Sequence, residues 1–219
     1  MTRHEKRARS MRIVKDHQPW YHPIVLPGFV FTRPVNRETI AQWIRAERGA
    51  RKLNRFILPA LPEGLNGKSV VEIGSNAGAG LIWALRHGAS HCLGIEENER
   101  YYAQAIAVRD ALGISWEKLD LVNASFFGEF PLEPEHHGFD YCWVLNTLYH
   151  IPDHSRASVL RAAGWLARYV VVQGNGLEDR GRGDGYDSLM LLVKRSGLKV
   201  HSEKRQAHVR GLVVVCHAG

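Results

Sequence analysis

The chain has 219 residues, with 29 lysines and arginines against 22 aspartates and glutamates, and a formal net charge of +7 at pH 7. Since 45% of its residues are hydrophobic, it can bury a substantial core, which excludes a disordered polypeptide. No stretch approaches the roughly 18 consecutive apolar residues of a membrane span, and no secretory signal is visible. The sequence therefore predicts a cytoplasmic protein with no membrane partner.

Positive charge gathers near both ends of the chain. Six cations lie within residues 1–16, and six more lie between Lys194 and Arg210. Such clusters can bind the phosphates of a nucleic acid. Runs of charge also commonly stay in water as a solvated tail or edge, so both interpretations remain open.

The cysteines and histidines do not predict a disulfide or a metal site. Each of the three cysteines lies within an apolar run, which indicates a buried free thiol in a reducing compartment: Cys92, Cys142 and Cys216. His136 and His137 are adjacent, so they face opposite sides of an extended segment. A proline interrupts the helical spacing of His150 and His154.

The secondary-structure pattern from Ser69 onward alternates short β-branched runs with amphipathic segments. We expect helices at 79–87, at 98–112, around 159–166 and up to about residue 197. The expected strands lie at 69–73, 91–95, 119–122, 139–145, 169–173, 199–206 and 211–217. These elements predict a Rossmann-like α/β fold with a seven-stranded, mostly parallel sheet, helices on both faces and an antiparallel last strand.

An N-terminal leader, residues 1–66, precedes the domain that we place at residues 67–219. The leader contains the run Trp20-Tyr21-His22-Pro23 and a helical stretch from about residue 36 to residue 58. It is short for an independent domain. We interpret it as a lid or buttress over the carboxyl edge of the sheet.

The first predicted βα turn carries the clearest functional signal, the run Glu72-Ile73-Gly74-Ser75-Asn76-Ala77-Gly78-Ala79-Gly80. Gly74 and Gly78 let the backbone approach a ligand closely, and amides at the start of the next helix can bind its polar groups. Asn76 stands where a dinucleotide fingerprint needs a glycine, which disfavours pyrophosphate binding. Glu96 ends the second strand, where a carboxylate can accept both hydrogen bonds of a ribose diol. This interpretation requires the turn and Glu96 to face one cavity.

The acid-x-G-x-x-x-G turn resembles motif I of the class I methyltransferases that use S-adenosyl-L-methionine (SAM). The resemblance implies that Glu72 helps to hold the amino-acid end of SAM and that Gly74 and Gly78 line it. Many members place an acid against the adenine amino group, whereas this chain has Asn123-Ala124-Ser125, where Asn123 or Ser125 can accept that hydrogen bond. Further predicted cofactor contacts are Ser75, Asn76, Glu96, Glu97 and Asn146.

Within this class, the sequence resembles the branch that forms 5-oxyacetyl and 5-methoxy groups on the wobble uridine of tRNA. The resemblance spans residues 18 to about 175 and rests on Trp20-Tyr21-His22, the first turn, Leu93-Gly94-Ile95-Glu96 and Leu148-Tyr149-His150. Branch members that use a carboxylated SAM carry basic residues after the Tyr-His pair. This chain has Ile151-Pro152 there, so plain SAM is the expected donor.

Methyl transfer requires alignment of the acceptor and, for a hydroxyl or an amine, removal of a proton. His150 is the candidate base, because it follows the fourth strand and imidazole titrates near neutral pH. It can instead cap the next helix or hydrogen-bond within the core. Tyr149, Tyr21 and His22 are candidates for contact with the acceptor; the alternatives are an aromatic filler at Tyr149 and a Trp-Tyr anchor that packs the leader.

Three functions remain open from the sequence. The leading hypothesis is methylation of an oxygen or nitrogen of a small-molecule acceptor, because no appended nucleic-acid module is visible. The second is methylation of tRNA, which the resemblance and the basic clusters favour. The third is a non-catalytic protein that binds SAM or a dinucleotide. The sequence does not reveal the oligomeric state.

Overall fold

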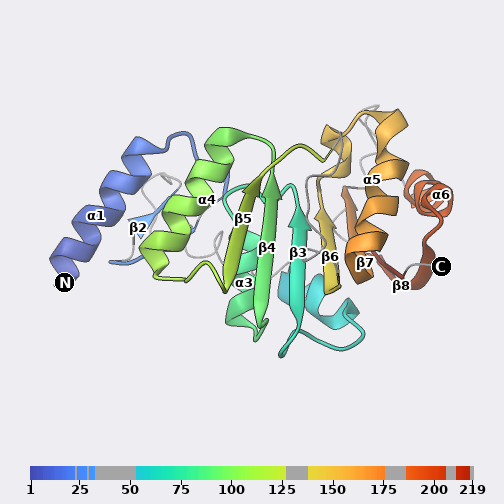
Figure 1. The fold of residues 1–219 in the computed structure, drawn as a ribbon, viewed down its shortest axis with the longest axis horizontal. Helices are drawn as coiled ribbons and strands as arrows, with labels where there is room; N and C mark the ends of the chain where they lie inside the picture. The colour runs from blue at the N-terminus through green and yellow to red at the C-terminus, as the bar shows by residue number, and fades with distance from the viewer. Residues whose placement is uncertain are drawn as a thin grey trace.

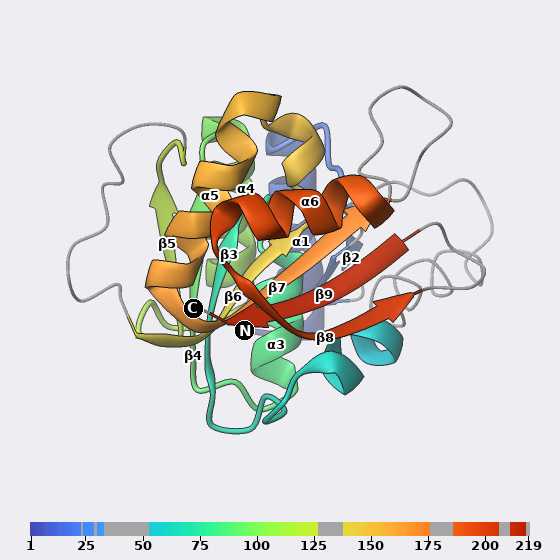
Figure 2. The ribbon, with the colours of Figure 1, turned by 90° about the vertical axis from the view of Figure 1, so that its right-hand side faces the viewer.

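A single mixed sheet of seven strands organises the protein, seen in a computed structural model that describes residues 1–22, 24–28, 30–32, 53–126, 138–175, 186–205 and 211–217. The strands are β3 (Ser69–Ile73), β4 (His91–Glu96), β5 (Leu119–Asn123), β6 (Phe139–Leu145), β7 (Ala167–Asn175), β8 (Lys199–Arg205) and β9 (Gly211–His217). Their order across the sheet is β5-β4-β3-β6-β7-β9-β8. Figure 1 shows the part from β5 to β7, and Figure 2 shows β9 between β7 and β8. All seven strands expected from the sequence are present.

The strand directions define the edge at which a ligand can bind. Neighbouring strands from β5 to β7 are parallel, while β9 runs antiparallel to both β7 and β8. The predicted antiparallel last strand is therefore confirmed. The order of the strands reverses between β3 and β6, and in open α/β sheets this switch point at the carboxyl edge is where ligands bind.

Helices cover both faces of the sheet. Two lie on the face that carries Val70 and Trp143: α3 (Ala79–Arg86) and α4 (Glu99–Leu112). The other face packs against α5 (Asp153–Leu166) and α6 (Tyr186–Ser196). Figure 2 shows α3 on one side of the sheet and α5 and α6 on the other. No helix within the described ranges is both long and apolar enough to cross a membrane.

The alternation of side chains along the strands divides the core into two apolar clusters. Val70 faces α3 and the leader, whereas its neighbour Val71 faces α5. Both are fully buried, and burial of one such side chain contributes about 1.5–3 kcal/mol. The three cysteines are free and buried, as predicted, and burial raises the pKa of the Cys216 thiol to about 12.

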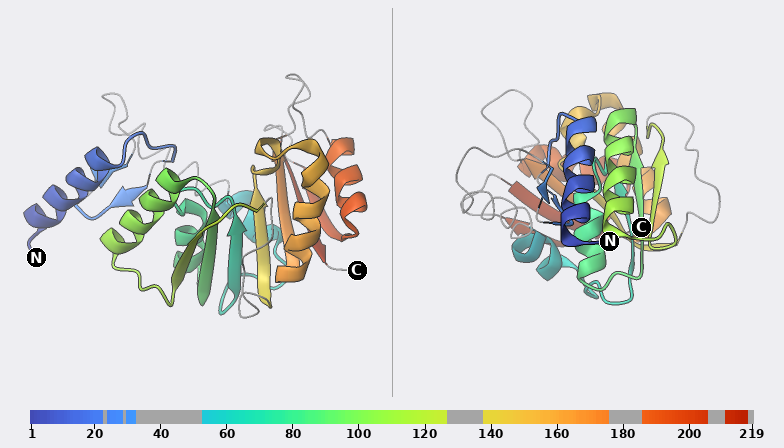
Figure 3. Two further views of the ribbon diagram at one scale, coloured as in Figure 1. Left: turned by 45° about the horizontal axis from the view of Figure 1, so that its top comes forward. Right: turned by 90° about the vertical axis from the view of Figure 1, so that its left-hand side faces the viewer.

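The leader begins with a helix that we did not predict, α1 (Arg3–Asp16), which lies beside α4 (Figure 3). Two short paired strands follow, β1 (Val25–Leu26) and β2 (Val30–Phe31), and further along come a π-helical turn, η1 (Leu53–Ile57), and a 3-10 turn, η2 (Leu58–Ala60). Of the helical stretch expected from 36 to 58, residues 36–52 lie outside the described residues. Leader side chains, among them Trp20 and Leu26, share the apolar cluster of Val70.

Candidate active site

A cavity of about 650 Å³ lies at the carboxyl edge of the sheet, beside the ends of β3, β4 and β6. This volume is in the range of small-molecule sites. The cavity is lined by residues from the leader, the first βα turn and the ends of β4, β5 and β6: Tyr21, His22, Ile73, Gly74, Asn76, Ile95, Glu96, Glu97, Asn98, Tyr101, Ala124, Phe126, Leu145, Asn146, Thr147, Tyr149, His150 and Ile151. The turn and Glu96 therefore face one cavity, as the sequence interpretation required.

At Gly74 the main chain lies so close to the Thr147 side chain that there is no room for a Cβ. Its φ is +73°, and a Cβ on it would lie 2.7 Å from Cγ2 of Thr147. The amides of Gly74 and Ser75 both donate to the carbonyl of Ile95, at 2.8 and 3.1 Å. These bonds tie the turn to β4, so the turn and the end of β4 form one rigid wall.

Asn76 and Gly78 complete the turn in left-handed conformations. The φ of Asn76 is +51°, which asparagine tolerates better than most residues, and its side-chain oxygen accepts the amide of Ala77 at 2.8 Å. Gly78 begins α3 with a φ of +76°. Gly78 and Ser75 shape the turn without lining the cavity, so their contact with a cofactor stays a prediction.

The Glu96 carboxylate is held in place by main-chain amides. It is 7% exposed and accepts the amide of Asn76 at 2.8 Å and that of Asn98 at 2.9 Å, one on each oxygen. Asn98 also caps α4, because its side chain accepts the amides of Arg100 and Tyr101. A carboxylate has about four acceptor sites, so both oxygens of Glu96 can still accept hydrogen bonds from two hydroxyl groups.

Beyond Glu96, polar side chains mainly support the wall of the cavity. The side-chain amide of Asn123 donates to the main-chain carbonyl of Glu96 at 2.8 Å, and the Ser125 hydroxyl donates to the Glu97 carboxylate at 3.0 Å. Asn123 and Ser125 do not line the cavity, and their predicted contact with adenine stays a prediction. The buried ring of Phe126 lines the cavity there, a residue that we did not select because it stands outside any motif.

Glu72 lies one layer behind the turn and does not line the cavity. Its carboxyl group packs against Gly80, where a Cβ would lie 2.8 Å from Oε2, and that oxygen has no hydrogen-bond partner among the described residues. Burial, and then the negative charge of Glu96, raise the pKa of Glu72 to about 8. The side chain is therefore mostly neutral near pH 7, and its role at the amino-acid end of SAM stays a prediction.

Two Tyr-His pairs from distant parts of the chain line one side of the cavity, which we call its mouth because Tyr21 and His150 are exposed there. Tyr149 and His150 lie in the 3-10 turn η4 (Leu148–His150), with ring centroids 4.0 Å apart, and the rings of Tyr21 and His22 are 4.7 Å apart. Burial, and the contact and hydrogen bond with Tyr21, raise the pKa of Tyr149. The four predicted catalytic residues thus lie together at one opening.

His150 is exposed at this opening, which excludes the two structural alternatives. The N-cap of α5 is Pro152, so His150 does not cap that helix. It does not lie in the core either. Its imidazole lines the cavity, where it can take a proton from a bound acceptor.

Asn146, immediately after β6, carries an unused acceptor. Its φ is +56°, and its amide group donates to the Gln173 side chain at 3.2 Å, which fixes the side chain in place. The side-chain oxygen of Asn146 is buried and has no partner within the described part of the chain. This oxygen can accept a hydrogen bond from an ammonium group or a hydroxyl group. Thr147, which the sequence patterns did not single out, lies beside it and faces Gly74.

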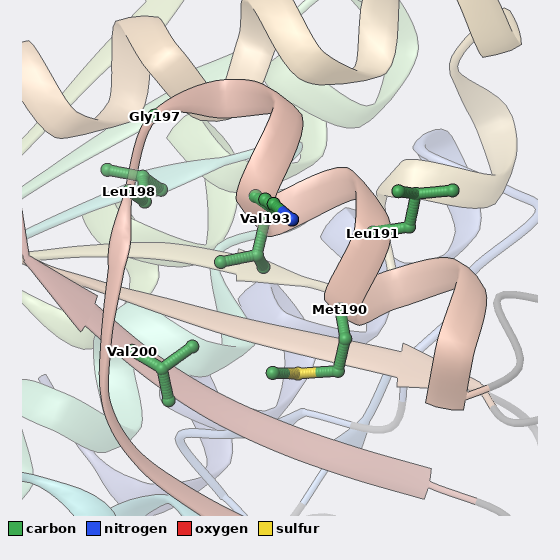
Figure 4. Close-up of a pocket in the computed structure, with 7 residues that line it drawn as sticks. Met190, Leu191, Val193, Gly197, Leu198 and Val200 are labelled. Atoms are coloured by element: carbon green, nitrogen blue, oxygen red, sulfur yellow. The ribbon is translucent and has the colours of Figure 1, made fainter.

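A second hollow, of about 510 Å³, lies between α6 and β8 (Figure 4). Met190 extends from α6 toward the strand that carries Val200. Lys194 is the one charged residue among those that line it, and the others are apolar or glycine. Among the described residues that line this hollow, no two polar groups are paired as chemistry would require.

Comparison with known proteins assigns the fold. No protein-family model and no curated protein matches the chain. Among solved structures, the N-terminal domain of EvdMO1 with SAH bound is similar, with a TM-score of 0.67 and 17% identity over 98% of this chain and 97% of that one. Magnesium protoporphyrin IX methyltransferase from Synechocystis PCC 6803, with bound SAM, gives 0.62 and 13% over 85% and 87%. Mitomycin 7-O-methyltransferase gives 0.62 and 16% over 82% and 57%. The fold is that of class I SAM-dependent methyltransferases.

Proposed function

We propose that the protein is a SAM-dependent methyltransferase that acts on an oxygen or nitrogen of a small-molecule acceptor. The observation that carries this proposal is the convergence of the glycine turn and the Glu96 carboxylate on one cavity, joined by the 2.8 Å bond from the amide of Asn76. The similar structures with bound SAM or SAH support the same cofactor. Two of the similar structures are named for different acceptors, magnesium protoporphyrin IX and mitomycin, so the comparison does not name the acceptor of this chain.

The residues at this edge of the sheet fit SAM. Glu96 offers carboxylate oxygens to the ribose hydroxyls, Gly74 leaves the backbone bare, and Asn146 presents its unused oxygen to the ammonium group. When bound, SAM supplies a methyl group made electrophilic by its sulfonium. Phe126 offers an apolar surface to the adenine ring, beside the end of β5.

The acceptor lies at the mouth, between the two Tyr-His pairs. His150 removes the proton from the acceptor hydroxyl or amine as the new bond forms, which general-base catalysis by a positioned imidazole can accelerate about 10²–10⁴-fold. His22 and the hydroxyls of Tyr21 and Tyr149 would bind the acceptor and orient it for transfer. This alignment converts a bimolecular reaction into one within a single complex.

Cofactor binding is tested by thermal unfolding with S-adenosylhomocysteine and, separately, with NADH. Saturation with S-adenosylhomocysteine should raise the melting temperature, since a ligand at 100 times its Kd stabilises the folded state by about 2.7 kcal/mol. NADH should leave it unchanged. Stabilisation by NADH alone would reject the proposal in favour of a dinucleotide-binding protein.

The acceptor class is tested with methyl-labelled SAM and a panel of acceptors. The panel includes D-fucose, with which the EvdMO1 domain has been crystallised, phenolic compounds, carboxylated tetrapyrroles, a cell metabolite extract and total tRNA. Label in a small molecule is the expected result. Label confined to RNA would reject the small-molecule acceptor, and binding without any label transfer would favour a non-catalytic role.

An RNA acceptor is the second candidate, and α1 is the observation that favours it. This helix carries six cations and leads directly into the Tyr21-His22 pair at the mouth. If RNA is the acceptor, binding should weaken steeply as salt increases, because phosphate contacts release counterions.

Three buried free thiols support a reducing, cytoplasmic setting for either acceptor.

A further inference from the structure

Gln104 is a polar residue on the buried side of α4, where the other buried residues are Ala105 and Val108. Its side chain is fully buried, and its amide group donates to two main-chain carbonyls of the leader. The distances are 2.6 Å to the oxygen of His17 and 2.9 Å to that of Pro19. Gln104 thus joins the sheet domain to a segment more than eighty residues earlier in the chain.

The segment that Gln104 holds runs directly into the mouth of the cavity. Trp20 follows Pro19, is 5% exposed, and donates its indole N–H to the carbonyl of Val14 at 2.9 Å. Tyr21 comes next, is 56% exposed, and contacts Tyr149 across the mouth. The two hydrogen bonds of Gln104 therefore fix the backbone within two residues of Tyr21.

The geometry of Gln104 indicates a role other than filling space. An apolar side chain of similar length would pack there without bringing a polar group into the core. The Gln104 side-chain oxygen has no partner in the described ranges, so the contribution of the amide comes from its two donated bonds. Those bonds satisfy the main-chain carbonyls of His17 and Pro19, which precede the Tyr21-His22 pair.

We propose that Gln104 is a positioning residue of the acceptor site: it clamps the main chain of residues 17–19 and so keeps Tyr21 against Tyr149 at the mouth. The part of this inference that concerns the acceptor rests on the proposed function. The clamp itself is independent of it. The cofactor end is held by other bonds, those of Glu96 with Asn76 and Asn98, so the loss of the clamp leaves that end intact.

The test compares Gln104→Met, which keeps the length of the side chain and removes the donors, with the wild-type protein. Ser196→Ala is the matched control, because Ser196 is 3% exposed and donates to the Val193 carbonyl on α6, far from the mouth. Amide hydrogen exchange should become at least about tenfold faster in residues 17–22 of Gln104→Met, while exchange in β3 and β4 stays unchanged. Ser196→Ala should leave residues 17–22 as in wild type.

A second readout follows Tyr149 itself by NMR titration of ring-labelled tyrosine, with Tyr149→Phe used to assign its signal. In the wild type, burial and Tyr21 raise the pKa of Tyr149, so Gln104→Met should lower that pKa toward the ordinary tyrosine value. A purely structural role for Gln104 would lower the melting temperature without moving this titration. Unchanged exchange in residues 17–22, or an unchanged Tyr149 titration, would overturn the clamp.

Binding and turnover complete the test. The affinity for S-adenosylhomocysteine should stay within about twofold in Gln104→Met, while the KM for the acceptor identified in the panel should rise about tenfold. An unchanged KM would reject the link between the clamp and the acceptor. If the wild type binds no S-adenosylhomocysteine, the proposed function fails, but exchange and titration still decide whether Gln104 positions the leader.

Discussion

The two ends of the cavity differ in the groups that line them: main chain at the turn after β3, and side chains at the mouth. At the turn after β3, glycines and main-chain amides form the wall, and the contacts connect segments that are neighbours in the sheet. At the mouth, four side chains from the leader and from η4 meet across the opening. A wall made of backbone has little freedom to change, because a single Cβ would collide. A mouth made of side chains depends on how two distant segments pack, and it can be adapted to different acceptors.

The strongest test of a backbone-built wall is Gly74→Ala. The added Cβ would meet Thr147 at 2.7 Å, and alanine in this left-handed conformation costs about 1–2 kcal/mol by itself. We expect loss of detectable S-adenosylhomocysteine binding in calorimetry and a clear drop in melting temperature. Gly67→Ala is the control, since its φ is also +73° but a Cβ added there would meet no described atom within 4 Å. Equal effects of the two substitutions would contradict the steric argument.

The mouth should separate turnover from cofactor binding, and His150→Gln tests this. Removal of the general base should lower kcat by about 100-fold or more, while the Kd of S-adenosylhomocysteine stays unchanged. The matched control is His154→Gln, an exposed histidine four residues further on that does not line the cavity. Full turnover in His150→Gln would remove this imidazole from the reaction.

Behind the turn, Glu72 should make stability depend on pH. Its pKa is about 8 in the folded protein and near 4.5 when unfolded, so the unfolded state releases this proton first and the free energy of unfolding falls as pH rises between these values. In Glu72→Gln the free energy of unfolding does not fall in this way, because glutamine does not titrate. Relative to wild type, the variant should therefore gain about 2–3 kcal/mol of stability between pH 5 and pH 7, measured by urea unfolding. A difference that does not change with pH would show that Glu72 is charged in the fold.

A smaller effect is expected at the end of β4, where a side chain completes the backbone wall. Glu96→Gln keeps the shape but replaces one acceptor oxygen by a donor group, and should weaken S-adenosylhomocysteine binding about tenfold. Glu99→Gln, an exposed position at the start of α4, should leave the Kd unchanged. Similar Kd values for Glu96→Gln and wild type would remove the carboxylate from the cofactor site.

The same contrast explains what the sequence could predict. The order of strands and helices from Ser69 onward follows from local patterns: the helix expected at 98–112 is α4, with Asn98 and Gly113 as its caps. The convergence of the turn and Glu96 was also predictable, because both end neighbouring parallel strands. Phe126 and Thr147 were missed, since nothing in their local sequence marks a residue that faces a cavity.

The leader was the least predictable part of the fold. The charge pattern of its first sixteen residues does not predict a helix, yet Thr2 and Glu5 form a capping box that begins α1. That signal was present in the sequence and was outweighed by the charge of the segment. The clamp by Gln104 had no such signal, because the carbonyls that it binds belong to a distant segment.

One consequence concerns α4, which contacts both ends of the cavity. The main-chain amide of its N-terminal cap, Asn98, binds Glu96, while Gln104 binds the leader about 1.7 turns later. A movement of this helix would therefore change the binding of the methyl donor and of the methyl acceptor together. Thermodynamic linkage then demands symmetry: the factor by which one ligand changes the affinity for the other is the same in either order of addition.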